Sequence, residues 1–180
     1  GGDYLPIPPA ILGVSEIENR SVLEDLANTD DLKKYNYQVV HKDGIDRRGI
    51  GCALLYMPQF FEVTNYNSHR IHTVDTNFKT RDQLMVSGIF DGEPLHIIVN
   101  HWPSRSGGEA RSRPKRNLAA DLTRFIVDSI LATDAQAKIV VMGDLNDDPT
   151  NESVMKHLSA KGQQEKMKGN DLFNPYFDFY

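Results

Sequence analysis

The chain has very little cysteine and no long apolar run. Its one cysteine, Cys52, cannot form an internal disulfide, and no cluster of Cys and His residues has the spacing of a zinc site. No apolar run reaches the roughly 18–20 residues that span a bilayer, so we expect no membrane span. The chain opens without Met and without a signal peptide, which suggests a processed or trimmed chain and leaves its compartment open.

Basic residues are outnumbered as well. Lys and Arg number 20 against 25 Asp and Glu, which gives a formal net charge of −5. This balance excludes a polycation that coats nucleic acid, but it allows a local basic patch. Hydrophobic residues make up 39% of the 180 residues, which is enough for one sizeable core and argues against a wholly disordered chain.

Short apolar runs bounded by Pro, Gly, Asp or Asn predict β-strands. The clearest runs are Ala10–Ser15, Gly51–Tyr56, Gln83–Phe90, Leu95–His101 and Lys138–Gly143, and weaker ones are Phe60–Tyr66 and Arg70–Val74. Asp91-Gly92 predicts a hairpin between two of them. The continuous apolar stretches Leu95–Val99 and Ile139–Met142 are typical of strands covered on both faces.

Three segments have helical patterns. Arg20–Ala27 carries capping-box spacing at Ser21 and Glu24, Pro114–Ala132 follows the 3.6-residue period, and Val154–Ala160 ends before a glycine. Strands and helices in this mixture predict an α/β protein with a mixed sheet and helices packed on its faces.

Carboxylates and an amide follow the last strong strand. Asp144 and Asn146 lie two residues apart, so they share a side if the chain stays extended. A carboxylate can bind a hard cation or accept a proton, and an amide can donate to an anionic oxygen. An Asx-rich turn ending at Pro149 explains the same residues equally well.

The first strand also ends in carboxylates. Glu16 lies nearest the strand, and Glu18 and Asn19 could simply cap the following helix. Carboxylates that converge at one sheet edge repel one another unless a cation lies among them, and oxygen ligands favour Mg²⁺ or Mn²⁺. Glu16 is therefore the better candidate ligand.

Two further segments could meet a phosphate. His101 ends a strand and Arg105 follows in a Gly-rich loop, which pairs a hydrogen-bond donor with a bidentate guanidinium. Arg48 stands beside flexible glycines before another strand and could reach a ligand or lie in a solvated turn.

Together and in this order, these features resemble the endonuclease/exonuclease/phosphatase superfamily. The matching pieces are Glu16 after a strand, Arg47-Arg48-Gly49 before Ala53–Tyr56, Asn100-His101-Trp102 with Ser104-Arg105, and Gly143-Asp144-Leu145-Asn146-Asp147. The resemblance implies a DNase I-like fold: a four-layered α/β sandwich of two packed, mostly antiparallel sheets flanked by helices.

The resemblance also implies phosphate-ester hydrolysis with Mg²⁺ or Mn²⁺. Glu16 would be the metal ligand, Asp144 would activate water, Asn146 would bind a phosphoryl oxygen and His101 would stabilise charge. We place Arg105 and Arg48 as substrate contacts from their chemistry.

Two features of the family pattern have no match in the chain. They are an opening strand that ends in Asn and a C-terminal Asp and His. We therefore expect residues 1–180 to form a single domain that lacks its first strand and its C-terminal catalytic segment. The substrate, nucleic acid or a small or lipid phosphodiester, stays open. The alternative is a non-catalytic binding module that retains the fold, and the sequence indicates no obligate protein partner.

Overall fold

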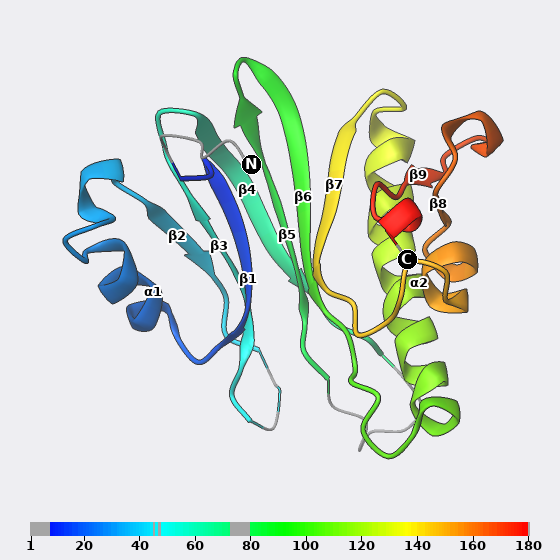
Figure 1. Cartoon of the computed structure of the whole chain (residues 1–180). Helices are drawn as coiled ribbons and strands as arrows, with labels where there is room; N and C mark the ends of the chain where they lie inside the picture. The colour runs from blue at the N-terminus through cyan, green and yellow to red at the C-terminus, as the bar shows by residue number, and fades with distance from the viewer. Residues whose placement is uncertain (1–7, 45, 47, 73–79, 180) are drawn as a thin grey trace.

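Two β-sheets pack face to face in the computed structural model, which describes residues 8–44, 46, 48–72 and 80–179 (Figure 1). The first sheet has the order β1-β3-β2, formed by β1 (Ile11–Ile17), β3 (Gly51–Tyr56) and β2 (Gln38–His41). The second has the order β4-β5-β6-β7, formed by β4 (Phe61–His69), β5 (Gln83–Phe90), β6 (Glu93–His101) and β7 (Lys138–Asp144). Within these two sheets only β6 and β7 pair in parallel.

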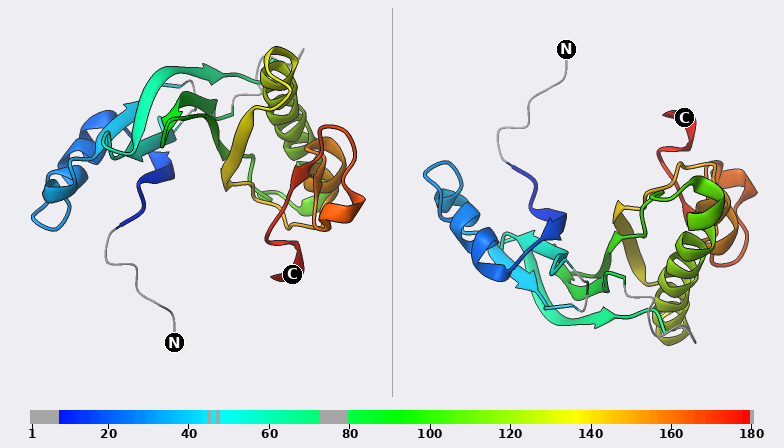
Figure 2. Two further views of the ribbon diagram at one scale, coloured as in Figure 1. Left: turned by 90° about the horizontal axis from the view of Figure 1, so that it is seen from above. Right: turned by 90° about the horizontal axis from the view of Figure 1, so that it is seen from below.

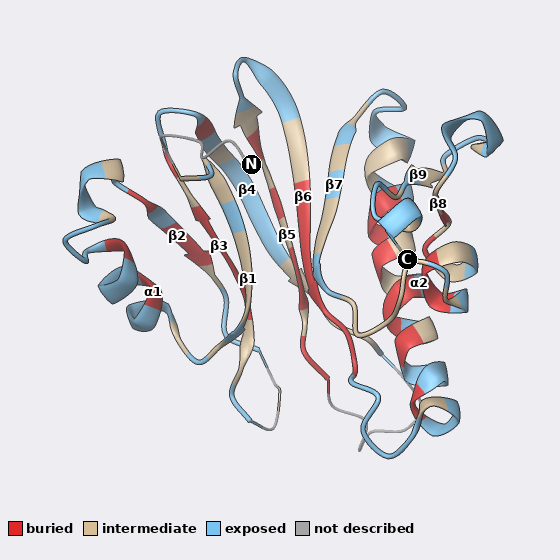
Figure 3. Cartoon of the chain, in the orientation of Figure 1, coloured by how far each residue is buried: buried red, intermediate tan, exposed pale blue. Residues whose placement is uncertain are grey.

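The core between the sheets comes from alternate residues of the central strands. Leu54 of β3, Val86 of β5 and Val99 of β6 are almost fully buried and belong to one hydrophobic cluster. Figure 3 shows the buried residues concentrated on these strands and on one side of the long helix. Alternation in strands puts the next residues, such as Ala53 and Ile98, on the outer faces.

A helix covers each outer face, as the two views in Figure 2 show. α1 (Arg20–Ala27) packs Leu23 and Ala27 on the first sheet, and α2 (Glu109–Thr133) packs Ile126 and Val127 on the second. The order helix, sheet, sheet, helix confirms the four-layered α/β sandwich.

The helix ends differ from the expected ones. α1 has the predicted bounds, but its cap is Asn19 rather than Ser21, because the Oδ1 of Asn19 accepts the Val22 N–H at 3.1 Å. α2 begins five residues before the predicted start, with Pro114 inside it. An ion pair of 2.5 Å between Arg116 and Glu109 holds this additional first turn.

The segment after β7 is shorter and less regular than predicted. A single π-helical turn, η2 (Ser153–His157), replaces the expected helix over Val154–Ala160. The helix ends because Ser159 has a φ of 60° and the chain enters β8 (Ala160–Lys161), which pairs with β9 (Leu172–Phe173). The remaining short elements are the 3₁₀ turns η1 (Lys33–Tyr35), η3 (Gln164–Lys166) and η4 (Phe177–Phe179).

The strand predictions have mixed outcomes. The five strong strands and the Asp91-Gly92 hairpin are confirmed, whereas β2 was not predicted. Residues 70–72 form no strand, and residues 73 and 74 of that weak candidate lie outside the described residues. β7 is not covered on both faces as expected, because Val140 on one of them is 40% exposed.

Candidate active site

Glu16 is presented by a distortion at the end of β1. The pairing of β1 with β3 shifts register between Val14 and Ile17, and Glu16 has a φ of 62° in the left-handed region. The backbone of a residue other than glycine is strained in this region, and such strain is concentrated at functional sites. The bulge interrupts the alternation of the strand, so the Glu16 side chain does not follow the in-and-out order of its neighbours.

His101 and Asp144 are brought together by strand pairing. They are register partners at the ends of the parallel strands β6 and β7. The two backbones approach closely just before them, where Gly143 has a φ of 122° and a Cβ would collide with the backbone of Asn100. Only glycine fits at this position without a shift of the strands.

The three side chains meet at one ring nitrogen. The Nε2 of His101 lies 3.9 Å from Oε1 of Glu16 and 3.8 Å from Oδ2 of Asp144. The His101 side chain is only 4% exposed, whereas those of Glu16 and Asp144 are 63% and 53% exposed. A buried imidazole thus lies beneath two solvent-facing carboxylates contributed by different sheets.

Burial lowers the pKa of His101, and the charge of Arg81 lowers it further. The carboxylates of Asp144 and Glu16 act in the opposite direction. A neutral imidazole carries one N–H, and two carboxylates facing Nε2 favour the tautomer with the proton on that atom. His101 can therefore donate one hydrogen bond into the space between the carboxylates.

Arg81 is a site residue that the sequence analysis missed. It is buried, and its guanidinium donates from Nε to the carbonyl of His101 at 3.2 Å and from Nη2 to that of Trp102 at 2.7 Å. Its Nη1 lies 4.0 Å from Asp46. Arg81 lies just before β5 in no recognisable motif, so only the tertiary structure identifies it as a support for the end of β6.

Asn146 lies beside Asp144 as predicted, in a turn rather than in an extended strand. It has a φ of 53°, its backbone N–H donates to Oδ1 of Asp144 at 2.9 Å, and its side-chain amide donates to the carbonyl of Trp102 at 2.9 Å. One carboxylate oxygen of Asp144 is thereby occupied, and the other, Oδ2, faces His101.

Arg105 is held by acidic side chains of the same loop region. Its guanidinium lies 2.8 Å from Asp148, 3.2 Å from Asp147 and 3.5 Å from Glu109, and it donates to the carbonyl of Asn146 at 3.0 Å. The hydrogen bond to Asp148 raises the pKa of the Arg105 guanidinium above its ordinary value. A phosphate at Arg105 would compete with these carboxylates, so its predicted role as a substrate contact stays a prediction.

Arg48 lies close enough to affect the pKa of His101, which its charge lowers. Its Nε is 3.8 Å from the largely buried Asp46, and its side chain is 58% exposed. Arg48 is thus a largely exposed cation near His101, and its predicted contact with substrate stays a prediction.

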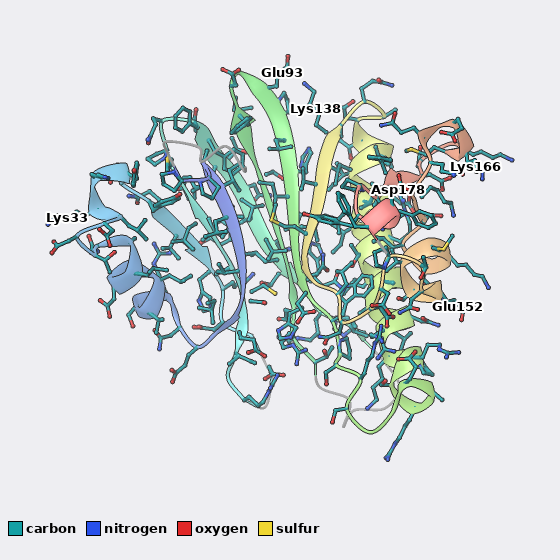
Figure 4. The ribbon with its side chains drawn as sticks, in the orientation of Figure 1. Lys33, Glu93, Lys138, Glu152, Lys166 and Asp178 are labelled. Atoms are coloured by element: carbon teal, nitrogen blue, oxygen red, sulfur yellow. The ribbon has the colours of Figure 1, made fainter. Side chains whose placement is uncertain are left out.

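A cleft of about 540 Å³ opens at the end of β7. Its lining includes Arg105, Asp144, Asn146, Asn174 and Tyr176. Glu93 and Lys138, at the start of β6 and β7, mark the opposite end of the same strands (Figure 4). The cleft therefore lies at the carboxyl ends of the parallel pair, where open α/β sheets usually bind ligands.

Comparison with known protein families matches residues 5–180 to the endonuclease/exonuclease/phosphatase family. The match extends over nearly the whole chain and includes every residue of the site described above. The chain belongs to the endonuclease/exonuclease/phosphatase family. No curated protein matches the sequence.

Solved structures of this family share the fold. Truncated TDP2 of Caenorhabditis elegans is 23% identical with a TM-score of 0.61, and the match covers 81% of this chain and 52% of that one. The human Nocturnin catalytic domain with bound sulfate is 21% identical with a TM-score of 0.58, covering 84% of this chain and 58% of that one. ANGEL2, a 2′,3′-cyclic phosphatase in complex with adenosine-2′,3′-vanadate, is 16% identical with a TM-score of 0.59. The match covers 81% of this chain and 42% of that one. The family member described here thus matches about half the length of each relative.

Members of this family generally depend on a divalent metal. Across the described ranges, no three or more His, Cys, Asp or Glu side chains are placed to hold a metal ion. Glu16 and Asp144 nevertheless bring two oxygen donors to one place, and Mg²⁺ commonly takes one or two protein carboxylates with water and phosphate as its other ligands. The donors therefore fit a divalent cation in kind.

Membrane crossing finds no support in the structure. In the part of the chain that is described, no helix combines the length and the apolar character that a membrane span requires.

Proposed function

We propose that this protein hydrolyses phosphate esters with Mg²⁺ or Mn²⁺. The observation that carries the proposal is the meeting of Glu16 and Asp144 at the Nε2 of His101, within 3.9 and 3.8 Å. Phosphoryl transfer depends mainly on positioning and on neutralising the charge of the phosphate. The buried donor can position the phosphate, and the two exposed carboxylates can hold the cation that would neutralise its charge.

Each residue takes the role that its contacts allow. Asp144 accepts the proton of the attacking water through Oδ2, because Oδ1 already accepts the backbone N–H of Asn146. His101 donates a hydrogen bond from its Nε2–H to a non-bridging phosphate oxygen and keeps the proton. Asn146 donates the second hydrogen of its amide to the phosphoryl group, since the first is bound to the carbonyl of Trp102.

Glu16 would hold the divalent cation, with Asp144 as the nearest second carboxylate. A bound cation supplies positive charge that stabilises the transition state at phosphorus. Arg48 and Arg105 would hold further phosphate charge at the edges of the site.

Nucleic acid or a nucleotide is the substrate class that the relatives favour. The relative ANGEL2 is described as a 2′,3′-cyclic phosphatase and was solved with an adenosine vanadate. A small or lipid phosphodiester is the other class that the sequence left open, and both have the same reacting group.

The test is hydrolysis of bis-p-nitrophenyl phosphate, plasmid DNA and sphingomyelin by the purified protein with Mg²⁺ and with EDTA. We expect Mg²⁺-dependent turnover of at least one substrate. Asp144→Asn and His101→Gln should each reduce it roughly 100-fold or more, in the range of general acid–base catalysis.

Glu93→Gln is the matched control, because Glu93 pairs with Lys138 at the opposite end of the same strands (Figure 4). It should leave turnover unchanged. If the full-length protein hydrolyses none of the three substrates, the proposed enzyme activity is wrong and the alternative of a non-catalytic binding module gains support.

A further inference from the structure

The cleft at the end of β7 contains two residues that the proposed chemistry does not use. Asn174 and Tyr176 come from the segment after β9, yet they line the same cleft as Asp144 and Asn146. A wall contributed by a separate segment is well placed to contact the part of a substrate beyond its phosphate.

Tyr176 presents an exposed aromatic ring at this cleft. It is 68% exposed, and its ring centroid lies 6.3 Å from that of Phe179, which is 87% exposed. The two rings are tilted by 50°. Neighbouring aromatic rings on a surface leave apolar area in water, and such patches commonly mark binding sites.

The ring is held by an anchored turn. The carboxamide oxygen of Asn174 accepts the N–H of Tyr176 at 3.1 Å, and the N–H of Asn174 donates to the carbonyl of Lys161 at 2.8 Å. Phe177 then packs tightly over Gly162, where any Cβ would collide with its ring. A ring whose backbone is fixed loses little freedom when a ligand stacks on it.

We propose that Tyr176 is the stacking platform for a nucleobase joined to the phosphate that reacts at Asp144 and His101. The proposal rests on the proposed function and narrows its substrate to nucleotides and nucleic acids. A base has a π-face that stacks on an aromatic ring and an edge that forms hydrogen bonds. The cleft offers both kinds of partner, since Arg105, Asn146 and Asn174 line it with Tyr176.

An acyl chain would use different surroundings. A second, mainly apolar cleft of about 710 Å³ borders β7 and is lined by Val140, Leu172, Phe173 and Tyr176, among others. It shares Gly143, Leu145, Val154, Asn174 and Tyr176 with the first cleft but lacks Asp144 and Asn146. The first cleft brings the ring together with Asp144 and Asn146, whereas Glu16 and His101 lie outside its lining. The polar groups beside the ring favour a base over a lipid tail.

The test compares two ligands that differ only in the base. Isothermal titration calorimetry measures Kd for thymidine 5′-monophosphate and for deoxyribose 5-phosphate. We expect the wild-type protein to bind the nucleotide roughly tenfold more tightly, as stacking on one aromatic ring provides. Tyr176→Ala should abolish this difference, and Tyr176→Phe should retain it.

Phe125→Ala is the matched control, because Phe125 is 65% exposed on α2 and lines neither cleft. It should leave the ratio of the two Kd values unchanged. Equal binding of the two ligands by the wild-type protein would overturn the proposal, and so would a ratio that Tyr176→Ala does not alter. A decanoyl phosphate that binds more tightly than the nucleotide, and loses affinity in Tyr176→Ala, would overturn it in favour of a lipid.

These readouts need no turnover, so they separate the two proposals. A base preference that depends on Tyr176 supports the stacking site even if no substrate is hydrolysed, in which case only the proposed hydrolysis fails. Hydrolysis without any base preference leaves the proposed function in place and removes the stacking site.

Discussion

His101 and Asp144 are register partners on two parallel strands, and Nε2 of His101 lies 3.8 Å from Oδ2 of Asp144. Paired residues of neighbouring strands project from the same face of a sheet. Their relative position is therefore set by backbone hydrogen bonds rather than by a loop. Glu16 reaches them from the other sheet, so the complete group depends on the packing of the two sheets as well.

The left-handed backbone of Glu16 predicts a conflict between stability and function. Glycine relieves the strain at a φ of 62°, and alanine does not. We expect Glu16→Gly to have a free energy of unfolding about 1 kcal/mol higher than Glu16→Ala, while both lose metal-dependent hydrolysis. Urea denaturation measures the difference. Glu18 is the control, because its φ is not positive: there the alanine variant should be more stable than the glycine variant. If the glycine variant were the more stable one at both positions, the strain at Glu16 would be contradicted.

The close approach of β6 and β7 predicts that Gly143 cannot be replaced. A Cβ there would collide with the backbone of Asn100 and would also need a φ of 122°. Gly143→Ala should therefore be strongly destabilised, by roughly 3 kcal/mol or more, as for overpacking combined with backbone strain. Thermal unfolding measures this against Gly92→Ala, where a φ of 81° applies but no atom lies within 4 Å of the added Cβ. Equal losses in both variants would show that the contact with Asn100 is unimportant.

Much of the fold could be predicted because local patterns agree with it. Gly51–Tyr56 is uniformly apolar and became the central strand β3, and Asp91-Gly92 became the tight hairpin between β5 and β6. Where tertiary contacts decide, the patterns failed. β7 is as apolar in sequence as β6, but it lies at an edge of its sheet. The first turn of α2 exists because Arg116 and Glu109 form an ion pair across it.

The candidate site shows the same division. Glu16, His101 and Asp144 could be named because each follows an apolar strand, and the structure brings all three together. Arg81 could not, because a buried arginine that donates to backbone carbonyls of another strand leaves no periodic signal. The partners of Arg105 also depend on the path of the loop after β7, which composition does not determine.

Three histidines predict how stability depends on pH. Burial lowers the pKa of His69, with Lys42 adding to the effect, and burial likewise lowers the pKa of His96 and of His101. As the pH falls, the unfolded chain takes up these protons first, at the ordinary value of about 6.5. It then holds more protons than the folded chain, so stability decreases with falling pH until the lower, folded-state pKa values are passed.

Urea denaturation between pH 7.5 and pH 5.5 measures this dependence while most carboxylates stay ionised. The free energy of unfolding should decrease towards pH 5.5. In the His69→Gln variant this decrease should be smaller than in the wild type. A wild-type protein that becomes more stable towards pH 5.5 would contradict the burial of these rings.

The buried ion pair between Arg116 and Asp147 predicts a large loss of stability when Asp147 is replaced. The Nε of Arg116 lies 2.7 Å from Oδ1 of Asp147, and their side chains are 0% and 2% exposed. Ser153 donates to the other oxygen of Asp147 at 2.5 Å, so the pair ties α2 to η2 beside the turn that follows Asp144. Asp147→Ala removes the buried partner of Arg116 but leaves its pair with the partly exposed Glu109, so it should cost about 2–4 kcal/mol.

A double-mutant cycle with Arg116→Met and Asp147→Leu separates the pair from the rest of its surroundings. The double variant should be more stable than the sum of the two single losses predicts, since each single variant leaves one buried charge without its buried partner. The exposed pair of Glu93 and Lys138, with side chains 65% and 59% exposed, is the control, and Glu93→Ala should cost less than about 1 kcal/mol. Strictly additive losses for Arg116 and Asp147 would mean that the two charges do not stabilise each other, and that packing alone holds the turn after β7 against α2.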